Sequence, residues 1–210
     1  MAEKENINEE ALHHYMSFQY VPEHTLTANI CTLSPGCYFK KIPGKPIVVS
    51  KYWELSFQPF YREKTEWQTL IKETSFSSVH AHLQSDVPVG SFLSGGIDSA
   101  IIASIAKEFK PDLTTFSIGF ETQGYSELDV ARESAEKLKI ENRRYTISAE
   151  EFAESLPKII WHMDDPLADP SCVPLYFLAK EARKHVKVVL SGEGADELFG
   201  GYNIYREPLR

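Results

Sequence analysis

A glycine-rich hexapeptide, Ser94-Gly95-Gly96-Ile97-Asp98-Ser99, carries the most specific chemistry in this sequence. An apolar run that predicts a β-strand precedes it, and an apolar-periodic segment that predicts a helix follows it. A helix N-terminus presents unpaired N–H groups and a partial positive charge, and adjacent glycines let the backbone close around an anion. Ser94 and Ser99 would add hydroxyl donors. We therefore interpret the hexapeptide as a phosphate-binding loop rather than as a glycine turn in which Asp98 or Ser99 caps a helix.

Asp98 narrows the kind of phosphate site that this loop can form. A carboxylate beside phosphates is tolerable when a magnesium ion bridges them. The glycines are not followed by a lysine, so this is not the GxxxxGK[ST] loop that common nucleotide hydrolases use to hold a triphosphate. The hexapeptide is instead suited to a pyrophosphate group with a metal ion.

A second motif, Leu190-Ser191-Gly192-Glu193-Gly194-Ala195-Asp196-Glu197-Leu198-Phe199-Gly200-Gly201-Tyr202, also follows a predicted strand. Ligands of open α/β sheets bind at the carboxyl ends of the strands. We therefore expect both motifs to face one site, in which Asp98 and Asp196 share a magnesium ion and Glu193 is available for proton transfer. The alternative for any one of these carboxylates is a solvated or capping role.

The elements that position these motifs alternate between short apolar strands and helices, which predicts βαβ units and a parallel sheet. Strands are expected at residues 88–93, 113–120, 142–147 and 187–190. Helices are expected around residues 101–109 and 128–138, the second opened by a capping box at residues 126–129. Ser148 with Glu151 repeats that start signal, and Pro157 is expected to divide the segment that follows into two helices. The last crossover helix is predicted from Ser171 to His185, with Pro174 in its first turn.

The first 60 residues are turn-rich and differ in pattern from the rest. Two short apolar runs, 37–39 and 47–49, flank a Pro/Gly turn and predict a β-hairpin. A long amphipathic helix is predicted from Tyr61 to Leu83. Tyr202 and Tyr205, near the other end of the chain, could line a ligand cleft, although a role elsewhere is favoured.

Composition excludes several classes of function. The chain has 210 residues, of which 42% are hydrophobic and 25% are charged, as in an ordinary globular protein. A net charge of −8 argues against nucleic acid and anionic membranes as partners. The sequence shows neither an apolar run long enough to span a membrane nor a signal-peptide pattern, which favours a cytoplasmic location. Three cysteines without a CxxC pair predict reduced thiols.

Taken together, the two motifs resemble the synthetase domain of the class B, glutamine-hydrolysing asparagine synthetases, a branch of the N-type ATP pyrophosphatases. Residues 115–120 and 164–171 fit the same resemblance, and residues 10–53 resemble the tail of that family's glutaminase domain with its linker. The resemblance implies an α/β fold, Rossmann-like and of the adenine nucleotide alpha hydrolase type, with helices on both faces of a parallel sheet. It also implies that residues 1–60 are the remnant of an Ntn-type glutaminase domain, including its β-hairpin, and that residues 61–210 begin the synthetase domain.

The resemblance further implies a reaction: ATP activates the aspartate β-carboxylate as β-aspartyl-AMP, pyrophosphate leaves, and ammonia attacks. It places Leu93 and Ile118 against adenosine; Ser94, Gly95, Gly96, Asp98 and Ser99 on the pyrophosphate; Ser191 and Gly192 on the nucleotide; and Asp98 and Asp196 on Mg²⁺. Glu193 would be the acid/base group that helps ammonia lose a proton as it attacks. The expected small-molecule partners are aspartate, ATP and ammonia.

The departures from the family pattern are also informative. Residue 2 is Ala2, where the family has a nucleophilic cysteine exposed by removal of the first methionine, so we expect no glutamine hydrolysis by this chain. The chain stops at Arg210, before a lysine that the family uses to steady pyrophosphate. We therefore expect a segment of a larger enzyme, incomplete for catalysis. The oligomeric state is left open, a homodimer of the full-length protein included.

Other functions remain compatible with the sequence. A β-lactam synthetase-like ligase would share the first motif but carry a tyrosine in place of Glu193, so Glu193 favours asparagine synthesis. A non-catalytic ATP-binding module is disfavoured because Asp98, Glu193 and Asp196 are all intact. An interaction fragment would be favoured only if the chain failed to bind nucleotide. The acidic run of Asp164, Asp165 and Asp169 is equally compatible with the aspartate pocket and with a turn or cap.

Overall fold

The computed structural model describes residues 6–21, 24–121, 126–164 and 168–205. The chain divides into two compact units. The first comprises Met1–Arg62 and Pro157–Pro170, and the second comprises Glu63–Leu156 and Ser171–Arg210. The first unit therefore includes a segment from far along the chain as well as the N-terminal region.

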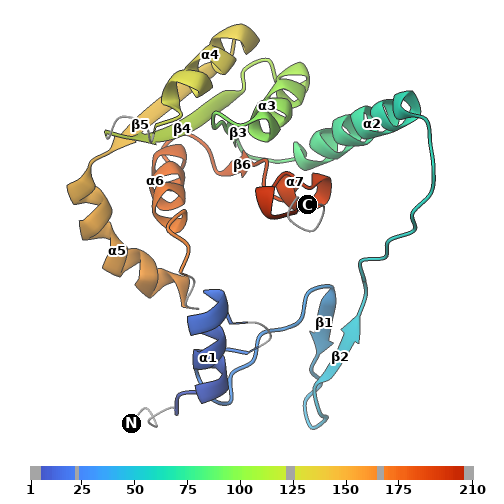
Figure 1. The fold of residues 1–210 in the computed structure, drawn as a ribbon, viewed down its shortest axis with the longest axis vertical. Helices are drawn as coiled ribbons and strands as arrows, with labels where there is room; N and C mark the ends of the chain where they lie inside the picture. The colour runs from blue at the N-terminus through green and yellow to red at the C-terminus, as the bar shows by residue number, and fades with distance from the viewer. Residues whose placement is uncertain (1–5, 22–23, 122–125, 165–167, 206–210) are drawn as a thin grey trace. The chain divides into compact units, whose positions relative to one another are not determined.

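The first unit contains a helix and a β-hairpin (Figure 1). Helix α1 (Glu9–Phe18) begins where the Asn8 side chain accepts a hydrogen bond from Ala11 N at 3.1 Å, which satisfies one of the free N–H groups of its first turn. Strands β1 (Cys37–Lys40) and β2 (Val48–Lys51) pair antiparallel, as the sequence predicted. Helix α1 was not predicted from the sequence, although Asn8 and two acidic residues in its first turn are start signals.

The second unit is built on a parallel sheet. Within the described ranges, four strands pair in the order β5-β4-β3-β6, and every pair is parallel. The strands are β3 (Val89–Phe92), β4 (Thr114–Phe120), β5 (Glu141–Ile147) and β6 (Val188–Leu190). Each lies within one residue of its predicted bounds, so the parallel sheet is confirmed.

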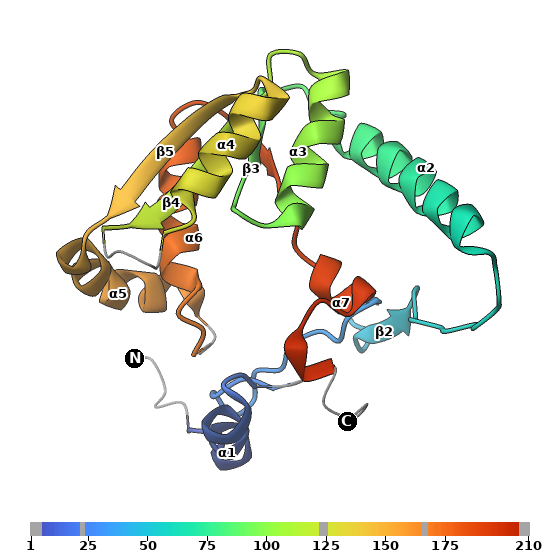
Figure 2. The ribbon, with the colours of Figure 1, turned by 45° about the horizontal axis from the view of Figure 1, so that its top comes forward.

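Helices cover both faces of this sheet, as predicted (Figure 2). Helices α3 (Ile97–Phe109) and α4 (Leu128–Leu138) lie on one face, and α6 (Cys172–Ala182) lies on the other, against β4 and β5. Helix α2 (Lys64–His82) packs on α3. It begins three residues later than the sequence predicted. Among the described helices, none combines the length and the apolar character that crossing a membrane requires.

Two apolar clusters hold the layers together. The larger joins α2, α3 and α4 to the sheet, and Leu93, Leu113 and Ala103 are among its almost fully buried members. The smaller lies on the side of α6, where Phe116 packs with Ala182 and Val186. Side chains of a strand alternate between its faces, so β4 can supply Phe116 to one layer while its neighbours face the other.

One prediction about the helices is wrong. Helix α5 runs without a break from Ala149 to Met163 and contains Pro157, where two separate helices were expected. Its start matches the sequence signal: Glu151 N donates to Ser148 Oγ and Ser148 N donates to Glu151 Oε2, both at 3.1 Å. Proline removes one helical hydrogen bond and crowds the preceding turn. This can kink a helix without ending it. The boundary between the two compact units falls at Pro157.

The predicted capping box of α4 is also wrong. The helix begins at Leu128, and no side-chain hydrogen bond caps its N-terminus at Glu127 among the described contacts. Ser126 Oγ accepts only a long hydrogen bond, 3.4 Å, from Leu128 N. The Glu127 carboxylate is instead bonded to the amide of Gly95. The acceptors of the predicted box were Ser126 and Asp129; Ser126 makes only this long contact among the described residues, and Asp129 forms an ion pair with Arg132 at 3.7 Å.

Candidate functional site

The order of the strands locates the site. From β3 the chain moves outward through β4 to β5, and it then returns to β6 on the opposite side of β3. Strands β3 and β6 are neighbours, with Ser91 opposite Leu190. Where the direction of travel reverses in an open α/β sheet, the segments after the two neighbouring strands diverge and leave a crevice at their carboxyl ends. Both sequence motifs begin at this crevice.

The first motif forms a loop that is braced from within. Ser99 Oγ accepts a hydrogen bond from Ser94 N at 3.0 Å, and the two serine hydroxyls lie 2.8 Å apart. Gly96 N donates to Ser94 Oγ at 3.1 Å. Helix α3 begins directly afterwards, with Asp98 in its first turn, where a negative charge interacts favourably with the helix dipole. The two serine hydroxyls therefore bond within the loop and shape it, and their role as donors to a ligand stays a prediction.

The second motif packs directly on the first. A Cβ added to Gly192 would lie 2.9 Å from Ser99 N and 3.1 Å from the carbonyl carbon of Asp98. These are backbone atoms of the first turn of α3, so only glycine fits here without moving a loop. Beyond it, Gly194 has φ of 89° and precedes the short helix α7 (Ala195–Phe199), which the sequence analysis did not predict.

A cavity of about 250 Å³ lies between the two motifs. All but one of the predicted site residues line it. They are Leu93, Ser94, Gly96, Asp98, Ser99, Ile118, Ser191, Gly192, Glu193 and Asp196. Gly95 is the exception, and its amide is occupied by Glu127 at 3.0 Å. The structure thus brings together residues from three strand ends, although their individual roles stay predictions.

The cavity also has walls that the sequence reasoning missed. Leu175 and Leu178 contribute from α6, and Phe92 contributes from the end of β3. Leu175 is about half exposed, and its i,i+3 spacing with Leu178 is the only sequence signal that could have marked this side. Tyr202 lines the cavity as well, which the sequence allowed but did not favour, whereas Tyr205 is not among the lining residues.

Tyr202 is held by a carboxylate of α7. Its hydroxyl donates to Glu197 Oε1 at 2.7 Å. This hydrogen bond, together with burial and nearby negative charge, raises the pKa of Tyr202 to about 12, and it lowers the pKa of Glu197 below its ordinary value. Tyr202 therefore keeps its proton at neutral pH and can act only as a neutral wall or hydrogen-bonding group.

The charged residues that line the cavity are all acidic. Asp98, Glu193, Asp196 and Glu197 all line it, whereas no Lys or Arg of the described residues does. Asp98 and Asp196 come from the two different motifs. The described residues hold no cluster of three or more His, Cys, Asp or Glu side chains that would bind a metal ion by itself. Magnesium, however, needs only one or two carboxylates when phosphates and waters supply its other ligands, and this set of donors fits that case.

Comparison with known proteins identifies the family. The asparagine synthase family matches residues 71–210 of the chain. The chain belongs to the asparagine synthase family. Asparagine synthetase [glutamine-hydrolyzing] 1 of Bacillus subtilis is 58% identical over 204 residues, which cover 97% of this chain and 32% of that protein. A putative asparagine synthetase [glutamine-hydrolyzing] of Mycobacterium tuberculosis is 49% identical with the same coverage.

The chain therefore spans about a third of the length of these relatives, at 32%. The resemblance that the two motifs suggested is confirmed. Among solved structures, an NH3-dependent NAD synthetase from Campylobacter jejuni is similar with a TM-score of 0.45 and 19% identity, covering 65% of this chain and 61% of that one. A likeness at that level is too distant to say more about the site.

A buried polar chain in this asparagine synthase family member supports the start of the first loop. Ser117 Oγ donates to the carbonyl oxygen of Leu93 at 2.5 Å, and Asn142 Nδ2 donates to Ser117 Oγ at 2.8 Å. Asn142 Nδ2 also contacts Thr115 Oγ1 at 3.1 Å. Buried polar groups are costly unless they are hydrogen-bonded, so these contacts fix β5, β4 and the end of β3 relative to one another. Ser117 and Asn142 carry no motif that would have revealed this role.

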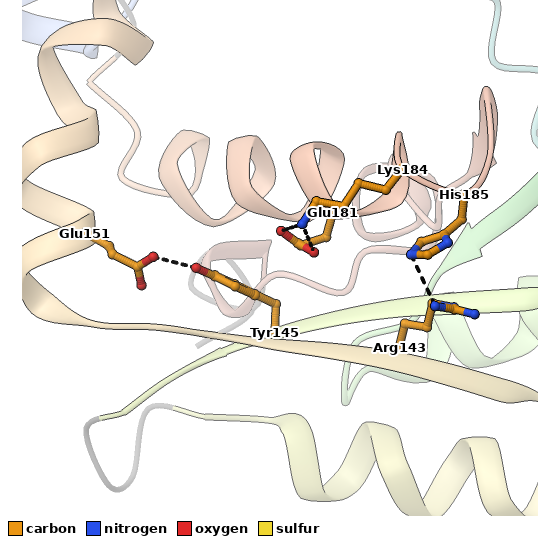
Figure 3. A network of polar contacts seen from close by, with 6 residues as sticks. All are labelled: Arg143, Tyr145, Glu151, Glu181, Lys184 and His185. Carbon is orange, nitrogen blue, oxygen red and sulfur yellow. Dashed lines mark hydrogen bonds and ion pairs between the residues drawn. The ribbon is translucent and has the colours of Figure 1, made fainter.

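A second set of polar contacts links β5 to α5 and to the segment that follows α6 (Figure 3). Arg143 Nη1 lies 3.2 Å from His185 Nε2, and a guanidinium has no acceptor, so the histidine nitrogen accepts the hydrogen bond. Tyr145 donates to Glu151 Oε1 at 2.5 Å. This bond raises the pKa of Tyr145 to about 12 and, with the Ser148 amide, lowers the pKa of Glu151. Arg143, His185, Tyr145 and Glu151 do not line the cavity, and their contacts join β5 to α5 and to His185, three residues beyond the end of α6.

The predicted acidic run is only partly described. Asp165 lies outside the described residues. Asp164, with φ of 57°, and Asp169 belong to the first compact unit, separate from the unit that contains the cavity. Their relation to an aspartate pocket therefore stays a prediction.

Proposed function

We propose that this chain forms the nucleotide-binding part of an ATP-dependent ligase that converts aspartate to asparagine through β-aspartyl-AMP, with release of pyrophosphate. The observation that carries the proposal is the contact of the two motifs at Gly192, which makes one cavity from two neighbouring strand ends. Membership of the asparagine synthase family supports aspartate as the substrate. The names of the relatives support glutamine as the ultimate source of ammonia.

In the proposed complex, the adenosine moiety lies against Leu93 and Ile118, which line the cavity beside the first loop. The pyrophosphate lies along the loop and the first turn of α3, where backbone N–H groups and the helix dipole favour an anion. Ser191 and Gly192 close the other side of the nucleotide. The neutral phenol of Tyr202 adds no charge to this site.

Magnesium is proposed from the balance of charge. ATP is an anion, and the cavity that would receive it is lined by four acidic residues and by no Lys or Arg among the described residues. Like charges in one cavity repel each other, so a cation must accompany the nucleotide. Asp98 and Asp196 are the proposed magnesium ligands because they reach the cavity from opposite motifs.

Glu193 is the proposed acid/base group. Glu193 lines the cavity in the turn between β6 and α7 and is exposed, so its carboxylate is the group proposed to take a proton from ammonia as the nitrogen attacks the activated carboxylate. The chain spans 32% of the length of its relatives. We therefore assign the binding of ammonia and aspartate, and the remaining groups of the site, to a longer protein. We place that protein in the cytoplasm.

The test separates adenylation from amide formation in the full-length protein that contains this chain. Aspartate-dependent exchange of pyrophosphate into ATP reports the first step, and asparagine formation from ammonia reports both. Glu193→Gln should preserve the exchange and slow asparagine formation by about 10²- to 10⁴-fold, the usual contribution of a positioned acid/base group. Glu133→Gln, on the exposed side of α4, is the matched control and should change neither rate.

Three results would contradict the proposal. Equal loss of both activities in Glu193→Gln would assign Glu193 to the nucleotide rather than to ammonia. ATP binding without aspartate-dependent exchange would favour a non-catalytic module, and exchange supported by a different carboxylic acid would favour a ligase of the β-lactam synthetase type.

A further inference from the structure

A carboxylate from outside the first loop occupies one of the loop's amides. Glu127 Oε2 accepts a hydrogen bond from Gly95 N at 3.0 Å, although the two residues are 32 positions apart. A Cβ on Gly95 would lie 3.0 Å from Glu127 Cβ and 3.1 Å from Glu127 Oε2, closer than nearly all real contacts of this kind. The glycine therefore allows the glutamate to lie directly over the loop backbone.

The amides on either side of Gly95 differ from it in the kind of acceptor that they have. Ser94 N and Gly96 N bond to serine hydroxyls of the same hexapeptide, which are neutral and move with the loop. Glu127 is charged and comes from the segment before α4. A carboxylate and a phosphate present similar anionic oxygens to a backbone N–H, and one N–H can serve only one of them well. Gly95 is also the one predicted site residue that does not line the cavity.

The position of Glu127 has a cost for α4. The residue stands at the N-cap of the helix, yet its side chain makes no capping bond to the described first turn. The Ser126 hydroxyl makes only the 3.4 Å contact with Leu128 N. Helix N-termini are normally stabilised by side-chain acceptors, so the carboxylate has an alternative set of donors close to its own backbone. It can therefore leave Gly95 by rotation of an exposed side chain.

We propose that Glu127 is a resident anion that occupies the phosphate loop in the free protein and is displaced when a pyrophosphate group binds. The inference rests on the proposed function, since it assigns the Gly95 amide to the pyrophosphate. Glu127 competes with the ligand for one donor and adds a negative charge beside it. It therefore weakens binding of pyrophosphate and nucleotide and favours release of the pyrophosphate product.

The test is a calorimetric titration of the 210-residue chain with magnesium pyrophosphate. Wild type is compared with Glu127→Gln, which keeps an acceptor and removes the charge, and with Glu127→Ala, which removes both. Glu133→Gln is the matched control, an exposed glutamate on α4. Both Glu127 variants should bind about two- to fivefold more tightly, as exposed charge interactions allow. The gain of Glu127→Gln should shrink as salt is raised, because salt screens the charge.

The sign of the change decides between competition and support. If Glu127 braces the loop for its ligand, both variants will bind more weakly, and that result or unchanged affinity would overturn the inference alone. If none of the folded proteins binds magnesium pyrophosphate, the proposed function fails and this inference fails with it. Circular dichroism and thermal unfolding of each variant establish that the proteins compared are folded.

Discussion

The contact between the two motifs predicts a large effect for Gly192→Ala. The added methyl group would lie 2.9 Å from Ser99 N and 3.1 Å from Asp98 C. Both are backbone atoms at the start of α3, so no side chain can rotate away to make room. The left-handed conformation that favours glycine is not involved at Gly192, so the conflict is steric. The second loop must therefore move away from the first, which widens the cavity.

The expected losses of stability and affinity in Gly192→Ala follow from the size of this steric overlap. Inserting a methyl group into a packed interface costs about 1–3 kcal/mol, and each kcal/mol lowers the Tm of a chain of this size by roughly 2–4 °C. We expect a loss of about 2–12 °C. Displacement of one wall of the site should also weaken magnesium–ATP by about tenfold or more, since 1.4 kcal/mol corresponds to a factor of ten.

The matched control is Gly44→Ala in the hairpin turn of the first unit. Gly44 has φ of 75°, and among the described residues no atom lies within 4 Å of a Cβ placed there. Its substitution costs about 1–2 kcal/mol of backbone strain without touching the cavity. Thermal unfolding and calorimetric titration with magnesium–ATP should show lost stability in both variants but lost affinity only in Gly192→Ala. Wild-type affinity and stability in Gly192→Ala would refute the packing of the two loops.

Two further predictions concern the polar contacts around the sheet. Ser117→Ala removes the donor to Leu93 and an acceptor of Asn142, so the free energy of unfolding in urea should fall by about 1–3 kcal/mol; an unchanged urea midpoint would contradict the role of this chain. Glu151→Gln should be less stable than wild type at pH 7, because the hydrogen bond from Tyr145 lowers the pKa of Glu151 below 4.5 in the folded state. That advantage of the wild type is present above the ordinary pKa and is lost as pH falls through the lowered one, so thermal unfolding curves of the two proteins should converge in acid; a difference that persists at low pH would mean that packing, not charge, separates them.

The parts of this structure that the sequence predicted well are those decided locally. Strands β3 and β6 lie in short runs rich in apolar residues, and the glycine-rich loops that follow them can be recognised from their own residues. Because both strands are parallel and adjacent, the two motifs had to meet at one edge. The predicted contact of Asp98 and Asp196 with one cavity follows from that topology.

The parts that were missed depend on distant contacts. The Glu127 carboxylate could accept a hydrogen bond from the first N–H groups of its own helix or from the distant amide of Gly95. Only the fold decides which of these donors it meets. Pro157 is a strong local signal for a break, but the helix on either side of it continues. Leu175 belongs to an ordinary apolar helix, and its place in the cavity wall depends on how α6 packs on β4.

The central claim is that the cavity between the two motifs binds ATP with magnesium. Calorimetric titration of this chain with magnesium–ATP, beside an Asp98→Asn variant, tests it most directly. We predict binding by the wild type that weakens by about tenfold or more in the variant, because the amide is a poorer magnesium ligand than the carboxylate. A folded wild-type chain that does not bind, or a variant that binds equally well, would contradict the account.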